Sequence, residues 1–114
     1  MMNRTRAVRS LAALAQETRL DAFRLLVQAG PGGLAAGDLA ARLDTSPPAL
    51  SFHLRGLAHA GLVRSRQDGR FNYYSADYDS MQALVAFLTE NCCGGAACAP
   101  ARVTGRKNSL RRIS

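Results

Sequence analysis

Three cysteines, the only ones in the chain, lie close together near its C-terminal end. They are Cys92, Cys93 and Cys98, in the segment NCCGGAAC that starts at Asn91. Thiolates are soft ligands and favour soft acceptors. Trivalent arsenic and antimony take three thiolates and need no fourth ligand. Arsenite or antimonite is therefore the ligand that these three side chains fit best.

Zinc, cadmium and a thiol oxidant are the alternative signals that these cysteines could sense. Structural zinc prefers four ligands, usually with Cys-x-x-Cys spacing, and neither His53 nor His59 is near the cysteines in sequence. A thiol-dependent arsenic reductase or a carrier would be a different class of protein. The chain has no phosphate-binding loop, no Cys-x-x-Cys before a helix and no βαβ pattern, so we expect no enzyme and no catalytic cofactor.

The element that must position the cysteines is a predicted helix from Asp77 to about Cys92. Its apolar face is formed by Met81, Leu84, Val85 and Leu88. Neighbouring residues of a helix point about 100° apart, because one turn takes about 3.6 residues. If Cys92 and Cys93 are to bind one atom, the helix end must distort. The following Gly94-Gly95 makes the chain pliant enough for Cys98 to fold back.

Length and composition predict one small domain. The chain has 114 residues, 47% of them hydrophobic, no Trp and only 6% aromatic residues, so the core must consist of Leu, Ala and Val. A second subunit would complete part of its apolar surface. No segment approaches the ~18 apolar residues of a membrane span, and the N-terminus lacks a secretory signal. We expect a cytoplasmic protein without membrane contact, in which clustered thiols indicate ligands and not disulfides.

The charge is unevenly distributed along the chain. The net charge is +7, and all basic residues but Lys107 are Arg. Residues 99–114 carry five basic residues and no acidic ones, whereas residues 1–98 carry 10 basic and 8 acidic residues. This division predicts a folded domain over 1–98 and a basic, disordered tail over 99–114. A basic excess favours a polyanionic partner.

The remaining elements predict a mainly α fold with a β-hairpin. Hydrophobic periodicity indicates helices over residues 4–15, 17–29 and 36–43, the first with an apolar stripe of Val8, Leu11, Ala12 and Ala15. After a turn, Ser46 is suited to cap a helix with Pro47 at its first position. This helix runs to about Ala60 and turns Leu50, Leu54 and Leu57 inward. Strands over 62–67 and 71–75 then flank an Asp68-Gly69 turn. This order is that of a winged helix-turn-helix.

Three stretches of the chain resemble the ArsR/SmtB family of metal-responsive repressors. They are LAQETRL (14–20), GDLAARLDTSPPALSFHLRGLAHAGLV (37–63) and RQDGRFNYYS (66–75), and the resemblance covers about residues 8–90. It implies that the helix from Ser46 enters the major groove of double-stranded operator DNA and that the wing approaches the minor groove or the backbone. It also implies a homodimer formed by the first and last helices. The ligand-free dimer would bind the operator, and the captured ligand would release it.

The same resemblance places candidate DNA contacts on the predicted reading helix and on the wing. They are Ser46, Pro48, Ser51, Phe52, His53, Arg55 and Arg70. The chain departs from the family at Pro47, Ala49 and Phe52, where polar or basic residues are common. Base reading would then use Ser51, His53, apolar contacts with thymine methyls and DNA shape. Alternatively, His53 is a packed, hydrogen-bonded histidine, and Arg55 and Arg70 are solvated surface charges.

The resemblance also locates the inducer site. The family's site in the short helix before the reading helix is missing, since residues 35–40 contain no cysteine. A second site on the last helix is missing too, because Asp77 and Asp79 are followed by no His. The chain resembles instead the arsenic-responsive members that carry a vicinal cysteine pair and a third cysteine after the last helix.

Overall fold

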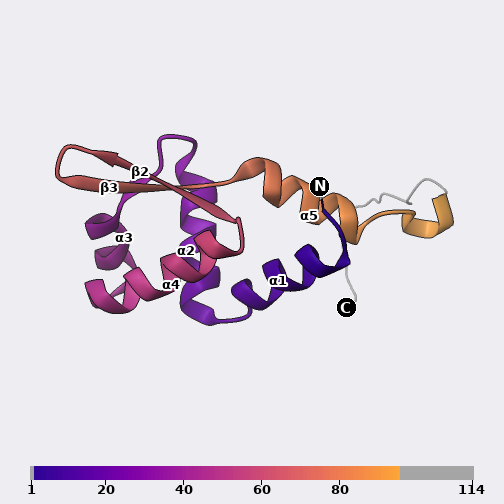
Figure 1. Ribbon diagram of the computed structural model, residues 1–114, viewed down its shortest axis with the longest axis horizontal. Helices are drawn as coiled ribbons and strands as arrows, with labels where there is room; N and C mark the ends of the chain where they lie inside the picture. The colour runs from indigo at the N-terminus through magenta and orange to yellow at the C-terminus, as the bar shows by residue number, and fades with distance from the viewer. Residues whose placement is uncertain (1, 96–114) are drawn as a thin grey trace, which may run out of the picture.

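The structure is a computed structural model that describes residues 2–95 (Figure 1). Cys98 and the predicted tail over 99–114 therefore lie outside the described residues. The elements are α1 (Arg4–Leu14), α2 (Glu17–Ala29), β1 (Leu34–Ala35), α3 (Ala36–Leu43), α4 (Pro47–His59), β2 (Val63–Asp68), β3 (Phe71–Ala76), α5 (Tyr78–Leu88) and the 3-10 turn η1 (Cys92–Gly95). The fold is a mainly helical winged helix-turn-helix, which confirms the predicted fold class.

Side chains cap the N-termini of four helices, because the first amides of a helix have no partner within it. Asn3 and Gln16 accept hydrogen bonds from the backbone N–H groups of residues 6 and 19, each at 2.9 Å. The Ser46 Oγ accepts one from the Ala49 N–H at 3.3 Å. Pro47 follows at the first helical position, where its missing N–H costs nothing. The predicted start of α4 is confirmed.

Leucine side chains from three helices and from the loop before β2 form the centre of the core. The three predicted inward residues of α4, Leu50, Leu54 and Leu57, are at most 1% exposed. They pack with Leu26 of α2, Leu39 of α3 and Leu62 before β2. Because the inner side of α4 is entirely buried, its opposite side must face outward.

The wing is part of a three-stranded antiparallel sheet with strand order β1-β3-β2. The sequence predicted only the hairpin, because the two residues of β1 are too few for an alternating pattern. The turn also differs by one residue from the prediction. Asp68 pairs with Phe71, so the two turn residues are Gly69 and Arg70, and Gly69 supplies the positive φ of 63°.

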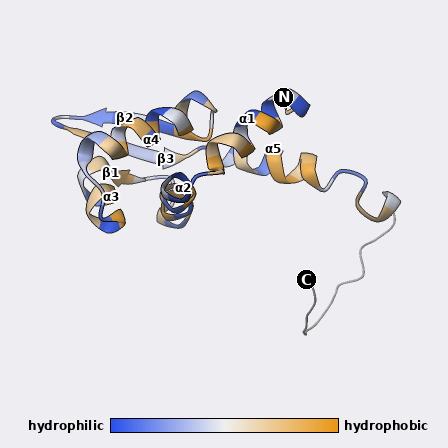
Figure 2. Ribbon diagram, turned by 90° about the horizontal axis from the view of Figure 1, so that it is seen from below, coloured by the Kyte–Doolittle hydropathy of each residue, from blue (hydrophilic) through white to orange (hydrophobic). Residues whose placement is uncertain are grey.

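Helices α1 and α5 contact each other on the side of the molecule away from the wing (Figure 1). The predicted stripe of α1 does not face the core, since Ala7, Ser10 and Ala13 are buried there instead. Val8 and Leu11 are 59% and 42% exposed. On α5 only Leu84 is buried, whereas Val85 and Leu88 are 55% and 56% exposed. Both helices therefore present apolar side chains to solvent in a single protomer, and Figure 2 shows the apolar character of α5.

None of the helices within residues 2–95 is long and apolar enough to cross a membrane.

Candidate DNA-binding surface and cysteine site

The outward side of α4 carries most of the side chains that the sequence singled out. Ser46, Pro48, Ser51, Phe52 and Arg55 are exposed, and the Phe52 side chain is 58% exposed although it is aromatic. His53 is partly buried. The predicted residues of α4 thus lie on or next to one surface, with Arg70 separate from them at the turn of the wing.

A residue of α2 that the sequence did not single out joins this surface. The Arg19 Nε donates a hydrogen bond to the His53 Nδ1 at 3.2 Å. Its guanidinium carbon also lies 5.5 Å from the centroid of the Phe52 ring, within the range of a cation–π contact. His53 is therefore hydrogen-bonded and partly buried. Arg19 was missed because it lies 34 residues before His53. Gly56, a glycine within a helix, was the available signal of a close approach.

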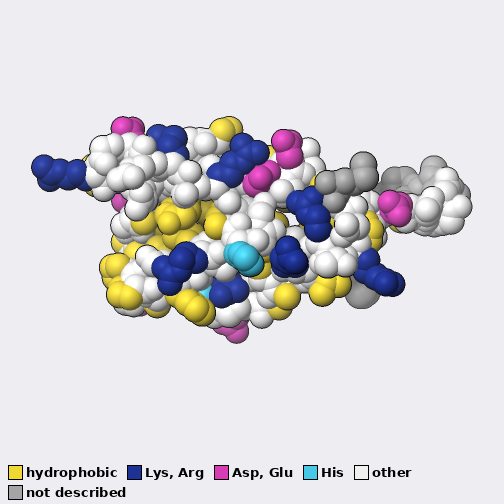
Figure 3. Space-filling view, in the orientation of Figure 1, with side chains coloured by type: hydrophobic (Ala, Val, Ile, Leu, Met, Phe, Trp, Pro, Cys, Tyr) yellow, Lys and Arg dark blue, Asp and Glu magenta, His cyan; other side chains and the backbone are white. Residues whose placement is uncertain are grey.

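An open hollow of about 630 Å³ lies beside α4. It is lined by Arg19, Phe52, Arg55, Gly56, Ala58 and His59. Figure 3 shows Arg side chains around a His on the face that carries α4, with hydrophobic side chains between α4 and the wing. Cationic and aromatic groups on one exposed face suit contact with a nucleic acid backbone and with base edges.

The wing carries three arginines in different environments. The Arg66 guanidinium lies 4.7 Å from the Tyr73 ring centroid and donates to the Gly32 carbonyl at 3.3 Å. Arg64 pairs with Asp77 at 3.2 Å. Arg70 is exposed at the turn. Arg66 and Arg64 therefore brace the wing against the rest of the protein, and Arg70 is the arginine at its tip.

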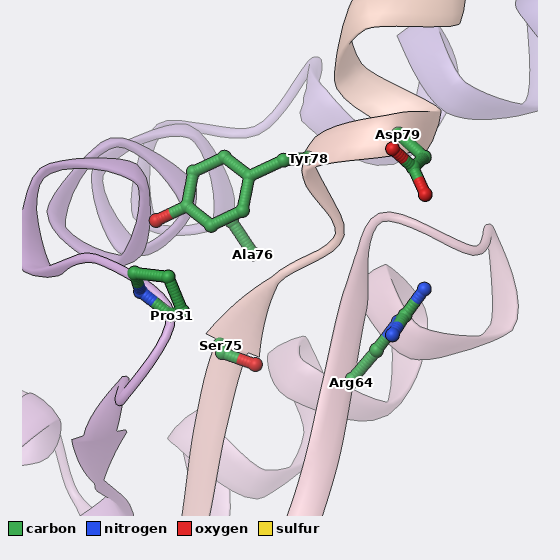
Figure 4. A pocket seen from close by; sticks show the side chains of 6 residues that line it. All are labelled: Pro31, Arg64, Ser75, Ala76, Tyr78 and Asp79. Carbon is green, nitrogen blue, oxygen red and sulfur yellow. The ribbon is translucent and has the colours of Figure 1, made fainter.

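The start of α5 is joined to both the wing and α2 (Figure 4). The Tyr78 Oη donates to the carbonyl groups of Val27 and Leu26, at 3.0 and 3.3 Å, at the end of α2. Burial raises the pKa of the Asp77 carboxyl, but hydrogen bonds from the Ser80 N–H and from Arg64 outweigh it and leave the pKa below its ordinary value. The pocket of about 230 Å³ at this junction is lined by Pro31, Arg64, Ser75, Ala76, Tyr78 and Asp79. The contacts around this pocket hold the start of α5 against α2 and β2.

The cysteines follow the end of α5, which the sequence placed too late. The helix ends at Leu88 and not at Cys92. Asn91 and Cys93 have positive φ values of 56° and 58°, a conformation that an α-helix does not contain. Cys92 and Cys93 are exposed in η1, and their Sγ atoms lie 3.7 Å apart. The chain has therefore left the α-helical conformation where the two thiols lie.

The third predicted ligand, Cys98, lies outside the described residues. Within residues 2–95, no three His, Cys, Asp or Glu side chains are grouped so that they could hold a metal ion. The described part of the candidate site is therefore the pair of adjacent thiols.

Sequence comparison identifies relatives that align with most of this chain. The family model of a helix-turn-helix domain matches residues 14–66. The transcriptional activator HlyU of Vibrio cholerae is 33% identical over 91 residues, which cover 80% of this chain and 82% of HlyU. The arsenical resistance operon repressor of Escherichia coli is 31% identical over 100 residues, covering 72% of this chain and 84% of that protein. A cadmium resistance regulator homolog of Staphylococcus aureus is 35% identical over 79 residues, covering 67% and 63%.

Solved structures show the same fold. An ArsR-like transcriptional regulator from Rhodococcus sp. RHA1 superposes with a TM-score of 0.69 at 28% identity and covers 80% of this chain and 83% of its own. The homodimeric winged helix-turn-helix DNA-binding domain of Mb0332 from Mycobacterium bovis has a TM-score of 0.62 at 26% identity, covering 83% and 88%.

The fold and the exposed side of α4 define a winged helix-turn-helix regulator. The relatives make the assignment more specific: the chain belongs to the ArsR family of DNA-binding transcriptional regulators. These proteins are regulators and not enzymes, as the sequence predicted. Two of these relatives are named for resistance to arsenicals and to cadmium.

Proposed function

We propose that the protein is a repressor that binds operator DNA as a homodimer and releases it when Cys92, Cys93 and Cys98 capture trivalent arsenic or antimony. The observation that carries the proposal is the adjacent thiol pair, whose Sγ atoms lie 3.7 Å apart at an exposed turn. Two thiolates that bind one tetrahedral zinc ion at about 2.3 Å stand about 3.8 Å apart. The pair therefore already has a spacing suited to two ligands of one soft ion.

The chain between Cys93 and Cys98 is short enough for the third thiol to join the pair in one site. Cys98 follows Cys93 by five residues, and an extended chain spans at most about 3.3–3.6 Å per residue. Five residues therefore keep Cys98 within about 17 Å of Cys93 at most. This segment contains Gly94 and Gly95, whose φ values are 66° and 92°, so the backbone here already uses conformations that favour a reversal of the chain.

DNA binding is assigned in this proposal to the outward side of α4 and to the tip of the wing. Ser46, Pro48, Ser51, Phe52, His53 and Arg55 would contact the major groove, and Arg70 would contact a phosphate. The support is the exposure of Ser46, Pro48, Ser51, Phe52 and Arg55 opposite the buried leucines of α4. Arg70 is exposed at the turn of the wing, and the face that carries α4 is basic. A helix of this kind fits the width of the major groove.

The homodimer is assigned to the apolar faces of α1 and α5. Val8, Leu11, Val85 and Leu88 are each more than 40% exposed, and covering them would remove apolar surface from water. Cys92 follows Leu88 by only four residues. A ligand that reshapes η1 would therefore act next to the dimer contact, and a change there alters the spacing of the two reading helices on DNA.

A divalent soft ion is the second candidate, because the same 3.7 Å pair also fits zinc or cadmium. Trivalent arsenic takes three thiolates, whereas a structural zinc site usually has four ligands. Equilibrium dialysis of the reduced protein with arsenite, and separately with cadmium, would measure bound ion per chain for wild type and for each Cys→Ser variant.

We expect one arsenic per chain in wild type and a loss of at least tenfold in affinity in each of the three variants. Arsenic binding that is unchanged in Cys98→Ser would contradict the three-thiol site. Cadmium that binds wild type more tightly than arsenite does would favour the second candidate.

A further inference from the structure

Gly56 lies within the C-terminal part of α4, where a glycine lowers helix stability relative to alanine. A Cβ atom at this position would lie 2.6 Å from the Arg19 Cζ and 2.7 Å from each of its Nη atoms. The glycine therefore leaves space that the guanidinium of Arg19 fills. The packing joins α2 to the side of α4 next to its exposed face.

The hydrogen bond from Arg19 determines which nitrogen of His53 carries the proton. A guanidinium has only donors, so the His53 Nδ1, at 3.2 Å from the Arg19 Nε, must accept. In the neutral ring the hydrogen then resides on Nε2. Arg19 and His53 are both partly buried, which limits the competition of water for this bond.

Phe52 belongs to the same cluster. The Arg19 guanidinium carbon lies 5.5 Å from the Phe52 ring centroid, and the Phe52 and His53 rings meet edge to face with centroids 5.6 Å apart. One arginine thus contacts two adjacent aromatic side chains on α4. Its contacts limit the orientations that both rings can adopt.

We propose that Arg19 is a positioning residue for DNA reading, which holds His53 as an Nε2–H donor toward an acceptor on the DNA. The inference rests on the proposed contact of α4 with DNA and names the chemistry of one contact. Acceptors in the major groove are the guanine N7 and O6, the adenine N7 and the thymine O4. The amino groups of cytosine and adenine are donors and would not pair with this form of His53.

Three variants separate positioning from simple packing. Arg19→Met removes the donor and the charge while keeping a long side chain, and Arg19→Lys keeps the charge without the planar donor. Gly56→Ala leaves Arg19 in place but displaces its guanidinium, and it favours the helix. Thermal unfolding of each variant would establish that the protein remains folded.

The first readout is the tautomer of His53 in the DNA-free protein, measured by ¹⁵N NMR of the imidazole nitrogens in slightly alkaline buffer. We expect the Nε2–H form in wild type and a mixture of both forms in Arg19→Met and Gly56→Ala. His59, also on α4, provides the control in the same spectra and should not change. An unchanged His53 tautomer in both variants would overturn the proposal.

The second readout is base preference, measured by selection of bound duplexes from a random DNA library. Arg19→Met, Gly56→Ala and His53→Ala should each lose preference, by about three- to tenfold, at the same base position. The double variant Arg19→Met/His53→Ala should lose no more than His53→Ala alone. If the tautomer changes but base preference does not, Arg19 has only a structural role and the proposal is wrong. If wild type binds no DNA, the proposed function itself fails, whereas the NMR result still reports on the pair.

Discussion

Gly33 lies at the point where the loop after α2 meets the wing. Its φ is +73°, and a Cβ atom at this position would collide with the Tyr74 carbonyl oxygen of β3. The next residue, Leu34, pairs with Tyr74 in the sheet. The absence of a side chain therefore lets β1 approach the wing and complete the sheet.

Gly33→Ala should destabilise the fold by more than about 1 kcal/mol. The backbone at this positive φ is strained for alanine, and the added methyl group would collide with the Tyr74 carbonyl oxygen. Gly32→Ala is the matched control, since nothing lies within 4 Å of its Cβ position. Urea unfolding would measure both. Equal stabilities of the two variants would contradict the described approach of β1 to β3.

The sequence predicted the residues whose role follows from their spacing within one helix. It missed those whose role depends on contacts between elements that are distant in the chain. Leu50, Leu54 and Leu57 were assigned to the core because helical spacing alone puts them on one side. Arg19 could not be found in this way, because its contacts with α4 exist only after α2 and α4 pack together. The spacing of the Cys92 and Cys93 thiols likewise depends on the positive φ of Cys93.

The elements of the fold are joined most clearly at the start of α5. Asp77 caps this helix through the Ser80 N–H at 3.0 Å and pairs with Arg64 of β2. Because its pKa is lowered in the folded state, the charged carboxylate stabilises the fold above the ordinary value of 3.8. This contribution is lost as the pH falls through the folded-state pKa.

Asp77→Ala should lower the free energy of unfolding by about 1 kcal/mol at neutral pH, because the cap is lost. Asp77→Asn should lower the free energy of unfolding by less than Asp77→Ala does, since Asn also caps helices. The difference between wild type and Asp77→Asn should shrink as the pH is lowered below 3.8. Urea unfolding across this range is the measurement, with Asp68→Asn as a control at an exposed ion pair. A difference that grows with acidity would contradict the lowered pKa.

The sequence predicted most helix boundaries because caps leave strong signals, as Ser46 and Pro47 do before α4. The predicted end of α5, at about Cys92, is too late. The chain leaves the helix earlier, after Leu88, and adopts a positive φ at the non-glycine residue Asn91. Such a conformation costs energy and leaves no reliable pattern in the sequence.

The whole molecule has an apolar surface that a single protomer leaves uncovered. The exposed residues of α1 and α5 lie on the side away from the wing (Figure 1). Sequence periodicity identified these residues as apolar stripes but could not tell a core-facing stripe from a subunit contact. The order of the predicted elements gave the winged helix-turn-helix fold, and the resemblance to the ArsR/SmtB family led to the proposal of a dimer.

Replacing Val85 and Leu88 together with Asp should separate the proposed dimer, because charges would be placed in an apolar contact. Sedimentation should give twice 12.2 kDa for wild type and 12.2 kDa for the double variant. Phe71→Asp, at a residue of the wing that is 59% exposed, is the control and should remain dimeric. A double variant that still sediments as a dimer would place the interface elsewhere.

The most direct test of the proposed switch is the release of DNA by arsenite. Fluorescence anisotropy would follow binding of the reduced protein to a labelled duplex from the DNA upstream of its own gene, with and without a few equivalents of arsenite. We predict tight binding that arsenite reverses in wild type, and tight binding that arsenite does not reverse in Cys92→Ser, Cys93→Ser and Cys98→Ser. Tight binding that arsenite leaves unchanged in wild type, or release that persists in all three variants, would contradict the three-thiol arsenic switch.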